Sequence, residues 1–120
     1  MEPLREELAA KACVPCRGGT PPMGQEEIAR IRPGVPGWNV VADHHLARAF
    51  VFRDFATALA FVDRVGALAE EQGHHPDIHL SWGKVAIETW THKIDGLTES
   101  DFVLAAKIDR LAAMAPGIES

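Results

Sequence analysis

The chain has 120 residues, and its composition, 47% hydrophobic and 24% charged, is that of one folded domain and excludes a largely disordered chain. Its formal net charge of −5 argues against direct binding to nucleic acid. No apolar run approaches the roughly 18 residues of a membrane-spanning helix, and the charged segment from Met1 to Lys11 lacks the apolar core of a secretory signal. These features predict a soluble cytoplasmic protein with no membrane contact.

Residues 1–24 differ from the rest of the chain, because they contain both cysteines and four of the eight prolines. A helical turn is possible before Cys13, but the prolines and glycines of residues 15–22 would end it. We therefore predict an extended or mobile arm over residues 1–24 and a folded domain over residues 25–120. The C-x-x-C pair of the arm, Cys13 and Cys16, has three interpretations: half of a zinc site, a redox pair, or two reduced cysteines in a loop. The last is the simplest interpretation, because the sequence has no second C-x-x-C.

The first half of the domain is predicted to form a short helix, a β-hairpin and a long helix. The short helix covers residues 26–31 and ends before Pro33 and Gly34. Strands at residues 40–41 and 45–53 flank a turn, and one face of the second is made of Leu46, Arg48, Phe50 and Phe52. The long helix spans residues 55–72 between a cap at Asp54 and an end at Gly73, with an apolar stripe of Phe55, Leu59, Val62, Val65 and Ala69.

The second half is predicted to form another hairpin and a final helix. Strands at residues 78–82 and 84–92 flank Gly83. The two faces of the later strand are made of Val85, Ile87, Thr89 and Thr91, and of Ala86, Glu88, Trp90 and His92. After a turn at Asp95 and Gly96, Thr98 caps a helix whose buried stripe is Phe102, Ala105, Ile108 and Ala112.

This order of elements predicts an α+β fold, a four-stranded antiparallel sheet with three helices packed on one face. The other face of the sheet then has no cover within the chain. Exposed apolar positions there, or an exposed edge strand, favour association with a second copy. We therefore expect a homodimer or a homotetramer.

The segment His74-His75-Pro76 follows the predicted end of the long helix and carries the best candidates for chemistry. A neutral imidazole donates at one nitrogen and accepts at the other, so histidines move protons near neutral pH. Pro76 restricts His75 to extended conformations, which makes the two imidazoles diverge. His92 joins them if its strand lies beside this turn, and the imidazoles could be oriented, or N–H groups of a ligand bound, by the carboxylates of Glu70 and Asp101.

Other interpretations of these histidines stay open at this point. Histidines on a turn are often solvated polar residues, and a zinc site would use His74, His75, His79 and His92, although their spacing matches no common zinc framework. His44 and His45 lie at the first predicted hairpin turn and are interpreted as surface residues. The tryptophans are expected in the core or in a pocket wall, and the better candidates for stacking on a planar ligand are Trp38 and Trp82.

The spaced pattern Glu70-x3-His74-His75-Pro76-x5-Trp82-x9-His92-x8-Asp101 resembles the signature of the pterin-4a-carbinolamine dehydratases, also called 4a-hydroxytetrahydrobiopterin dehydratases. The similarity extends over residues 25–111 and does not cover the cysteine pair. The resemblance implies an α+β fold in dimers or tetramers and a hydro-lyase that needs no metal or organic cofactor. The implied reaction removes water from 4a-hydroxytetrahydropterin to give quinonoid dihydropterin, and so supports tetrahydrobiopterin recycling for an aromatic amino acid hydroxylase.

By this resemblance the catalytic residues are His74, His75 and His92, with His74 and His92 as the acid/base pair and His75 in a binding and positioning role. The implied substrate-binding residues are Glu70, Gly73, Trp38, Trp90, Thr91 and Asp101. Imidazole suits proton transfer near neutral pH, and each such group is typically worth ~10²–10⁴-fold in rate. Residues 77–80 differ from the aromatic pair found at this place in animal members. This difference bears on specificity for the side chain of the pterin rather than on the reaction. The rival function is a binding role, because some members act as a transcription factor's dimerisation partner or in assembly.

Overall fold

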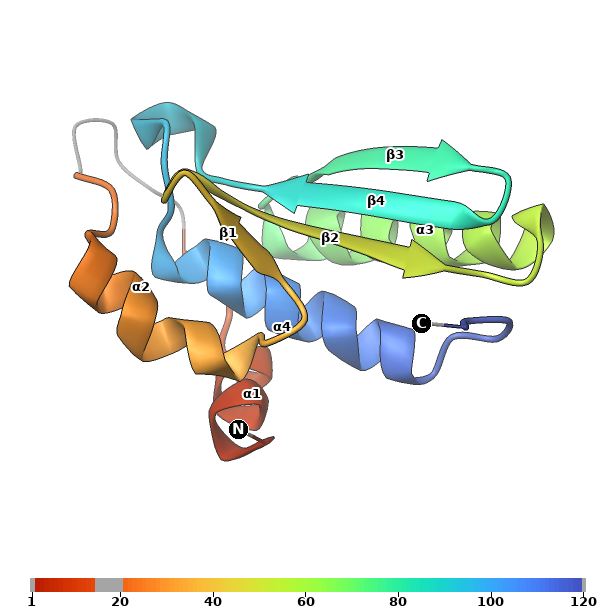
Figure 1. Ribbon diagram of the computed structural model, residues 1–120, viewed down its shortest axis with the longest axis horizontal. Coiled ribbons are helices and arrows are strands. Elements are labelled where there is room, and N and C mark those ends of the chain that lie inside the picture. Colours follow the sequence, from red (N-terminus) through yellow and green to blue (C-terminus); the bar gives the residue numbers. More distant parts are fainter. Residues whose placement is uncertain (1, 15–20, 120) are drawn as a thin grey trace.

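Figure 1 shows the protein as a computed structural model, which describes residues 2–14 and 21–119. The described residues form four α-helices: α1 (Glu2–Ala10), α2 (Gln25–Ile31), α3 (Phe55–Gln72) and α4 (Glu99–Ala113). The strands are β1 (Asn39–Val41), β2 (His45–Val51), β3 (Asp77–Ser81) and β4 (Lys84–Thr89), and two 3-10 helices are η1 (Arg32–Gly34) and η2 (His92–Ile94). The predicted α+β class is confirmed, and α1 is added to the three predicted helices.

The strands form one antiparallel sheet in the order β1-β2-β4-β3, and in its centre Phe50 lies opposite Val85. Figure 1 shows α3 and α4 on one face of this sheet. Alternation along the strands turns Phe50, Val85 and Ile87 toward these helices, where all three are buried, as predicted. The opposite face presents small side chains that are not buried, those of Ala47, Ala49 and Ala86.

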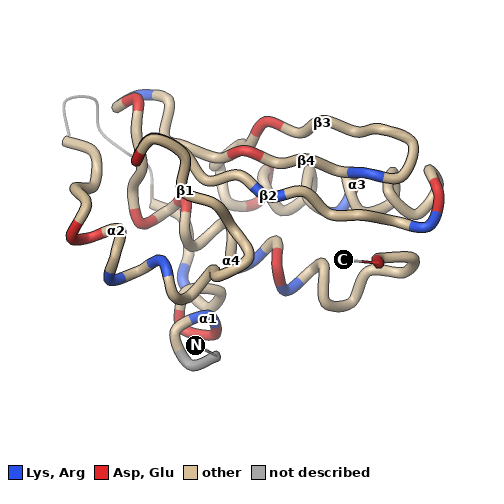
Figure 2. The backbone as a smooth tube through the Cα atoms, viewed as in Figure 1, with Lys and Arg blue, Asp and Glu red and all other residues tan. Residues whose placement is uncertain are grey.

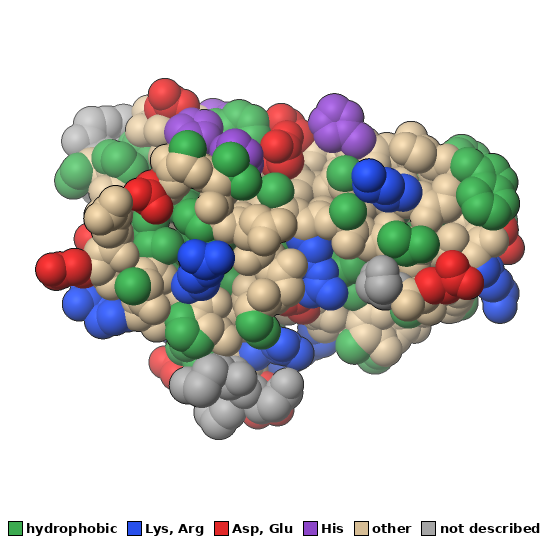
Figure 3. Space-filling view, viewed as in Figure 1, with side chains coloured by type: hydrophobic (Ala, Val, Ile, Leu, Met, Phe, Trp, Pro, Cys, Tyr) green, Lys and Arg blue, Asp and Glu red, His purple; other side chains and the backbone are tan. Residues whose placement is uncertain are grey.

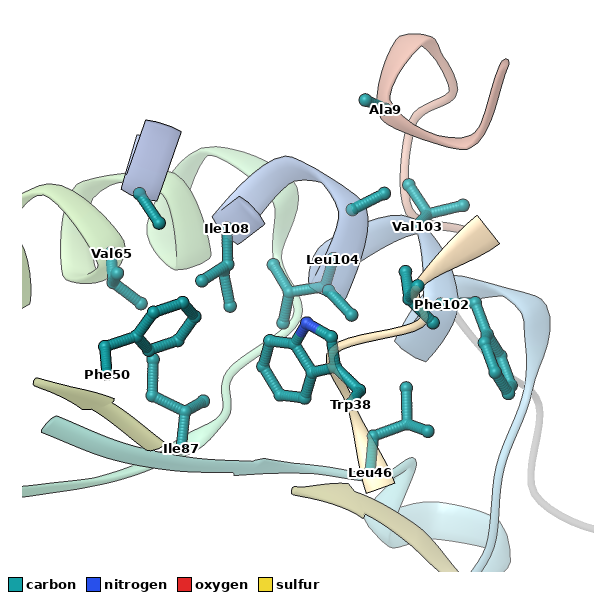
Figure 4. Packing of buried hydrophobic residues seen from close by; sticks show 14 of the residues in the cluster. Ala9, Trp38, Leu46, Phe50, Val65, Ile87, Phe102, Val103, Leu104 and Ile108 are labelled. Carbon is teal, nitrogen blue, oxygen red and sulfur yellow. The ribbon is translucent and has the colours of Figure 1, made fainter. Parts of the chain in front are cut away.

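The core between the sheet and the helices has Trp38 and Phe50 near its centre (Figure 4). The two rings meet edge to face with centroids 6.2 Å apart, and the ring of Phe61 from α3 lies 5.1 Å from that of Phe50. Helix α4 is buried on most sides, and its predicted stripe is buried throughout: Phe102, Ala105, Ile108 and Ala112.

Helix α3 begins and ends as predicted but turns a different face to the core. The side chain of Asp54 accepts a hydrogen bond from the Thr57 backbone N–H at 2.8 Å, which caps the helix. Phe55 and Leu59 of the predicted stripe are 44% and 42% exposed. The buried positions are Ala58, Phe61, Val65 and Ala69. The prediction of the stripe was wrong at its start because α3 carries two adjacent apolar rows, and periodicity does not distinguish which one meets the sheet.

Helix α1 lies against α4 on the side away from the sheet (Figure 1). Leu8 and Ala9 are buried in this contact, and the ammonium of Lys107 donates to the Ala9 carbonyl at 2.7 Å. The first part of the predicted extended or mobile arm is therefore helical and docked on the domain. Of the C-x-x-C pair, Cys13 follows α1 as a half-buried residue, whereas Cys16 lies outside the described residues.

The charged residues are spread over the chain, with Lys and Arg interspersed among Asp and Glu in Figure 2. This pattern differs from the basic stripe by which proteins typically follow a phosphate backbone. In the part of the chain that the structure describes, no helix is long and apolar enough to cross a membrane.

Candidate active site

Several segments meet at one end of the molecule: the end of α3, the end of β4 with η2, and the start of α4 (Figure 1). Helix α3 ends at Gly73, which has the left-handed conformation φ 64°, ψ 27°. The backbone N–H groups of Gly73 and His74 both point back to the carbonyl of Ala69. This closing turn directs the chain away from the helix axis and places His74 beside the start of α4.

The imidazole of His74 is held by the buried carboxylate of Asp101, with Nε2 and Oδ1 2.6 Å apart. Asp101 is 0% exposed and also accepts from the hydroxyls of Thr89 and Thr91, each at 2.8 Å, and from the Thr98 backbone N–H at 3.0 Å. An ionised carboxylate only accepts hydrogen bonds, so the Nε2 atom of His74 carries the proton. Its Nδ1 atom is thereby left to exchange a proton with a ligand.

The neighbouring imidazole of His75 turns to a different carboxylate. Its Nε2 lies 2.5 Å from Oε2 of Glu70, and both side chains are largely exposed. Since His74 and His75 bind separate carboxylates, the two imidazoles diverge as Pro76 led us to expect.

His92 reaches the site from a 3-10 turn rather than from a strand. Strand β4 ends at Thr89, and residues 92–94 form η2, so the prediction of a strand over 84–92 was too long. The Thr91 N–H donates to the Gly96 carbonyl at 2.8 Å, which closes a tight loop around η2. The imidazole of His92 then lies against the indole of Trp90, with ring centroids 4.4 Å apart and planes at 84°.

A pocket of about 250 Å³ lies between these groups and is lined by Gly73, His74, His75, Trp90, Thr91, His92 and Lys93. It unites the three predicted catalytic histidines with the predicted Gly73, Trp90 and Thr91. Its volume is slightly below the roughly 300–1,000 Å³ of pockets for drug-sized ligands and suits a small heterocycle. Lys93 was missed by the sequence analysis, where its position next to His92 was the only signal.

Trp38 lies in the core, one of the two places expected, but not beside the pocket, and Trp82 lies in neither of the expected places. Trp38, expected beside the pocket, is 1% exposed in the core, and its indole N–H donates to Oδ1 of Asp109 at 2.8 Å. Trp82 was the other candidate for stacking on a ligand, but it is 69% exposed on the turn between β3 and β4. Trp90 is therefore the tryptophan that lines the pocket.

His44 and His45, interpreted as surface residues, are partly exposed, but they also have a contact that was not predicted. Their rings lie 5.5 and 5.8 Å from the indole of Trp90. For the zinc alternative, no three His, Cys, Asp or Glu side chains of residues 2–14 and 21–119 are arranged as metal ligands.

The pterin 4 alpha carbinolamine dehydratase family model matches residues 21–111. The chain belongs to this family. A protein of Rubrobacter xylanophilus, provisionally named pterin-4-alpha-carbinolamine dehydratase, is 64% identical over 105 residues, which cover 88% of this chain and 98% of the relative. A protein of Alkaliphilus metalliredigens with the same provisional name is 56% identical over 104 residues, covering 86% and 94%. The resemblance drawn from the histidine pattern is confirmed, and so is the hydro-lyase class that these names carry.

Solved structures of the family share the fold. A transcriptional coactivator/pterin dehydratase from Brucella melitensis superposes with a TM-score of 0.71 at 28% identity, covering 75% of this chain and 97% of the other. A pterin dehydratase-like protein identified as a RuBisCO assembly factor in the alpha-carboxysome superposes with a TM-score of 0.55 at 30% identity, covering 62% and 88%.

Proposed function

We propose that this chain dehydrates 4a-hydroxytetrahydropterin to quinonoid dihydropterin with histidines as general acid and general base. The observation that carries the proposal is the meeting of His74, His75 and His92 in one pocket beside the buried carboxylate of Asp101. Membership of the dehydratase family supports the substrate class.

The proposed reaction removes one water from the pterin. A general acid protonates the departing 4a-hydroxyl, and a general base takes the N5 proton, so that a double bond forms between C4a and N5. One proton enters the substrate and one leaves it, which returns the pair of histidines to its starting charge. Imidazole suits both roles near neutral pH.

We assign the acid and base roles to His74 and His92. Because Asp101 occupies Nε2 of His74, the proton is exchanged through Nδ1. His75, held by Glu70 at the exposed rim of the pocket, binds and positions the substrate. The other substrate-binding residues in this proposal are Gly73, Trp90 and Thr91, which line the pocket, whereas Trp38 lies in the core and the buried Asp101 orients His74.

We also propose that the chain works as a homo-oligomer in tetrahydropterin recycling linked to an aromatic amino acid hydroxylase. The uncovered sheet face with Ala47, Ala49 and Ala86 supports self-association, because small side chains let a second surface approach closely. Sedimentation of the purified protein tests the proposed homo-oligomer.

The test of the activity is a stopped-flow assay of 4a-hydroxytetrahydropterin dehydration, with and without a chelator. The proposal expects chelator-resistant activity in the wild type, a loss of about 10²-fold or more in His74→Ala and in His92→Ala, and little change in Arg64→Ala. Arg64 is the control because it is exposed on α3, away from both the pocket and the uncovered sheet face. Full activity in the His74→Ala, His92→Ala double variant would contradict the assignment, and chelator-sensitive activity with stoichiometric zinc would contradict the metal-free mechanism.

The second candidate function is protein binding, because one structural neighbour is described as a transcriptional coactivator and the other as an assembly factor. The two candidates make different predictions for the histidines. If the function is protein binding, His74→Ala should keep the oligomeric state and the partner binding of the wild type. The wild type should then show no dehydration above the uncatalysed rate.

A further inference from the structure

A second pair of adjacent histidines lies behind the pocket, on the hairpin between β1 and β2. His44 and His45 come just after the turn of this hairpin, and Figure 3 shows histidine side chains gathered over this end of the molecule. Their ring centroids lie 5.5 and 5.8 Å from that of Trp90, while His92 contacts the same indole with centroids 4.4 Å apart. Trp90 is therefore surrounded by three imidazoles, of which His92 lines the pocket.

The two histidines are hydrogen-bonded to each other and lie between two carboxylates, one hydrogen-bonded to His44 and one within ion-pair distance of His45. His44 Nε2 lies 2.7 Å from Oδ1 of Asp95, the two Nδ1 atoms lie 3.1 Å apart, and His45 Nε2 lies 3.3 Å from Oε2 of Glu88. Because a carboxylate only accepts, Nε2 of His44 carries a proton. The Nδ1 contact needs one further proton between two lone pairs.

The backbone around these contacts is strained. Among the described residues, the non-glycine residues with positive φ are Ala42 at 53°, Asp43 at 53° and Asp95 at 51°. Ala42 and Asp43 form the turn that presents His44, and Asp95 is the acceptor of its imidazole. Left-handed backbone is unfavourable for residues other than glycine and persists where surrounding contacts over-determine it. All of this strain therefore borders one contact, that between His44 and Asp95.

The same contact connects the hairpin to the loop that carries His92. Asp95 follows η2 directly, and its backbone N–H donates to the His92 carbonyl at 3.2 Å. Glu88 lies on β4, two positions before Trp90. The side-chain contacts from Asp95 through the two histidines to Glu88 thus connect the two backbone segments that flank Trp90. They can therefore hold both the indole of Trp90 and the loop that carries His92.

We propose that His44 and His45, held between Asp95 and Glu88, are positioning residues that fix the indole of Trp90 as the wall on which the pterin ring stacks. The proposal rests on the proposed dehydratase function and names a determinant of its substrate affinity. Neither histidine lines the pocket, so both act through Trp90 and leave the proton transfers to His74 and His92.

The test separates substrate affinity from chemistry in His44→Ala, His45→Ala, Trp90→Ala and the His44→Ala, Trp90→Ala double variant, with Arg64→Ala as the control. KM and kcat come from the stopped-flow assay, and the Kd of 7,8-dihydrobiopterin comes from quenching of tryptophan fluorescence or, where Trp90 is replaced, from calorimetry. We expect KM and Kd to rise roughly two- to tenfold in His44→Ala, His45→Ala and Trp90→Ala, the size of one aromatic contact, with kcat within twofold of the wild type in the two histidine variants. The double variant should bind no worse than Trp90→Ala, because the proposal places the effect of His44 on binding entirely in the position of Trp90.

A direct readout is the imidazole ¹⁵N spectrum, in which the shared Nδ1 proton of the wild type should be lost in Asp95→Asn. Equal KM values in His44→Ala and Arg64→Ala, or a fall in kcat without a change in KM, would overturn the proposal. If His44→Ala does not fold, as its melting curve would show, His45→Ala and Asp95→Asn carry the same test. A wild type that binds dihydrobiopterin through Trp90 without dehydrating the carbinolamine would refute the proposed function but support the positioning role of His44 and His45.

Discussion

The imidazole of His74 and the carboxylate of Asp101 lie 2.6 Å apart across the junction of α3 and α4. Asp101 has a second task, because its Oδ2 accepts from the backbone N–H of Thr98 and so caps α4. One buried side chain therefore fixes both the start of a core helix and the orientation of a candidate catalytic histidine. The geometry of the site is thus set by the same contacts that stabilise the fold.

Replacing Asp101 by Asn tests this relationship. An amide offers one acceptor oxygen and a donor NH₂, so at least one of the four present donors loses its partner. We expect kcat to fall about 10²-fold, as for loss of one general acid or base, and the combination with His74→Ala to be no worse than His74→Ala alone. Asp109→Asn is the matched control, a buried Asp of the same helix away from the pocket, and an equal loss of kcat there would show that Asp101 acts only through folding.

The sequence predicted the site where it depends on local order, and it failed where distant segments meet. The helix end at Gly73, the divergence of His74 and His75, and the cap at Thr98 all follow from neighbours within a few positions. The contact of His44 with Asp95 was not predicted, because the two residues are 51 positions apart in the chain. No periodicity or motif connects these two residues.

The fold was predictable because strands with one buried face alternate and because helix caps are local signals. The end of β4 was misjudged because Thr91 stays buried like Thr89, so the alternation continues after the ladder has ended. The position of Trp38 depends on α4, whose Asp109 receives its indole N–H. That partner could not be inferred from the residues around Trp38.

The left-handed backbone of Gly73 predicts opposite results for the same substitution at two glycines of α3. Gly73→Ala should lower the free energy of unfolding by about 1–2 kcal/mol through backbone strain alone, since no heavy atom lies within 4 Å of an added Cβ. Gly73→Asn should cost less, because Asn tolerates this conformation. Gly66→Ala, inside the helix and equally open, should stabilise by about 0.5–1 kcal/mol. Urea unfolding measures all three, and a stabilising Gly73→Ala would refute the assigned conformation.

Asp109 predicts a stability that falls as pH rises. Burial raises the pKa of this carboxyl. The hydrogen bonds from Trp38 and Arg48 and the charges of Arg48 and Arg5 lower the pKa, but by less than burial raises it. The folded protein therefore binds this proton more tightly than the unfolded chain, and stability is lost as pH rises from the unfolded pKa of about 3.9 through the raised one. Asp109→Asn should remove this component, so the wild type should lose stability relative to it as pH rises from about 4, as measured by urea unfolding. Asp109→Ala leaves both donors unpaired and should cost about 1–3 kcal/mol at any pH; a constant difference between the wild type and Asp109→Asn would contradict the raised pKa.

Cys13 should be an unreactive thiol despite its place in a C-x-x-C pair. Desolvation by burial raises its pKa from 9.0 to about 11, and its Sγ lies 3.5 Å from the Ser100 carbonyl, where the thiol donates. Because the thiolate is the reactive form, its population near pH 8 should be roughly 100-fold below that of a thiol with the ordinary pKa. In a Cys16→Ser variant, alkylation by iodoacetamide should therefore be slow in the folded protein and fast in urea.

The raised pKa of Cys13 also makes folding favour the protonated thiol, so the free energy of unfolding should decline as pH rises from 9.0 toward 11. The decline should be absent in a Cys13→Ser, Cys16→Ser double variant. Rapid alkylation of the folded protein would show that Cys13 leaves its contact with Ser100 and that the segment after α1 opens readily.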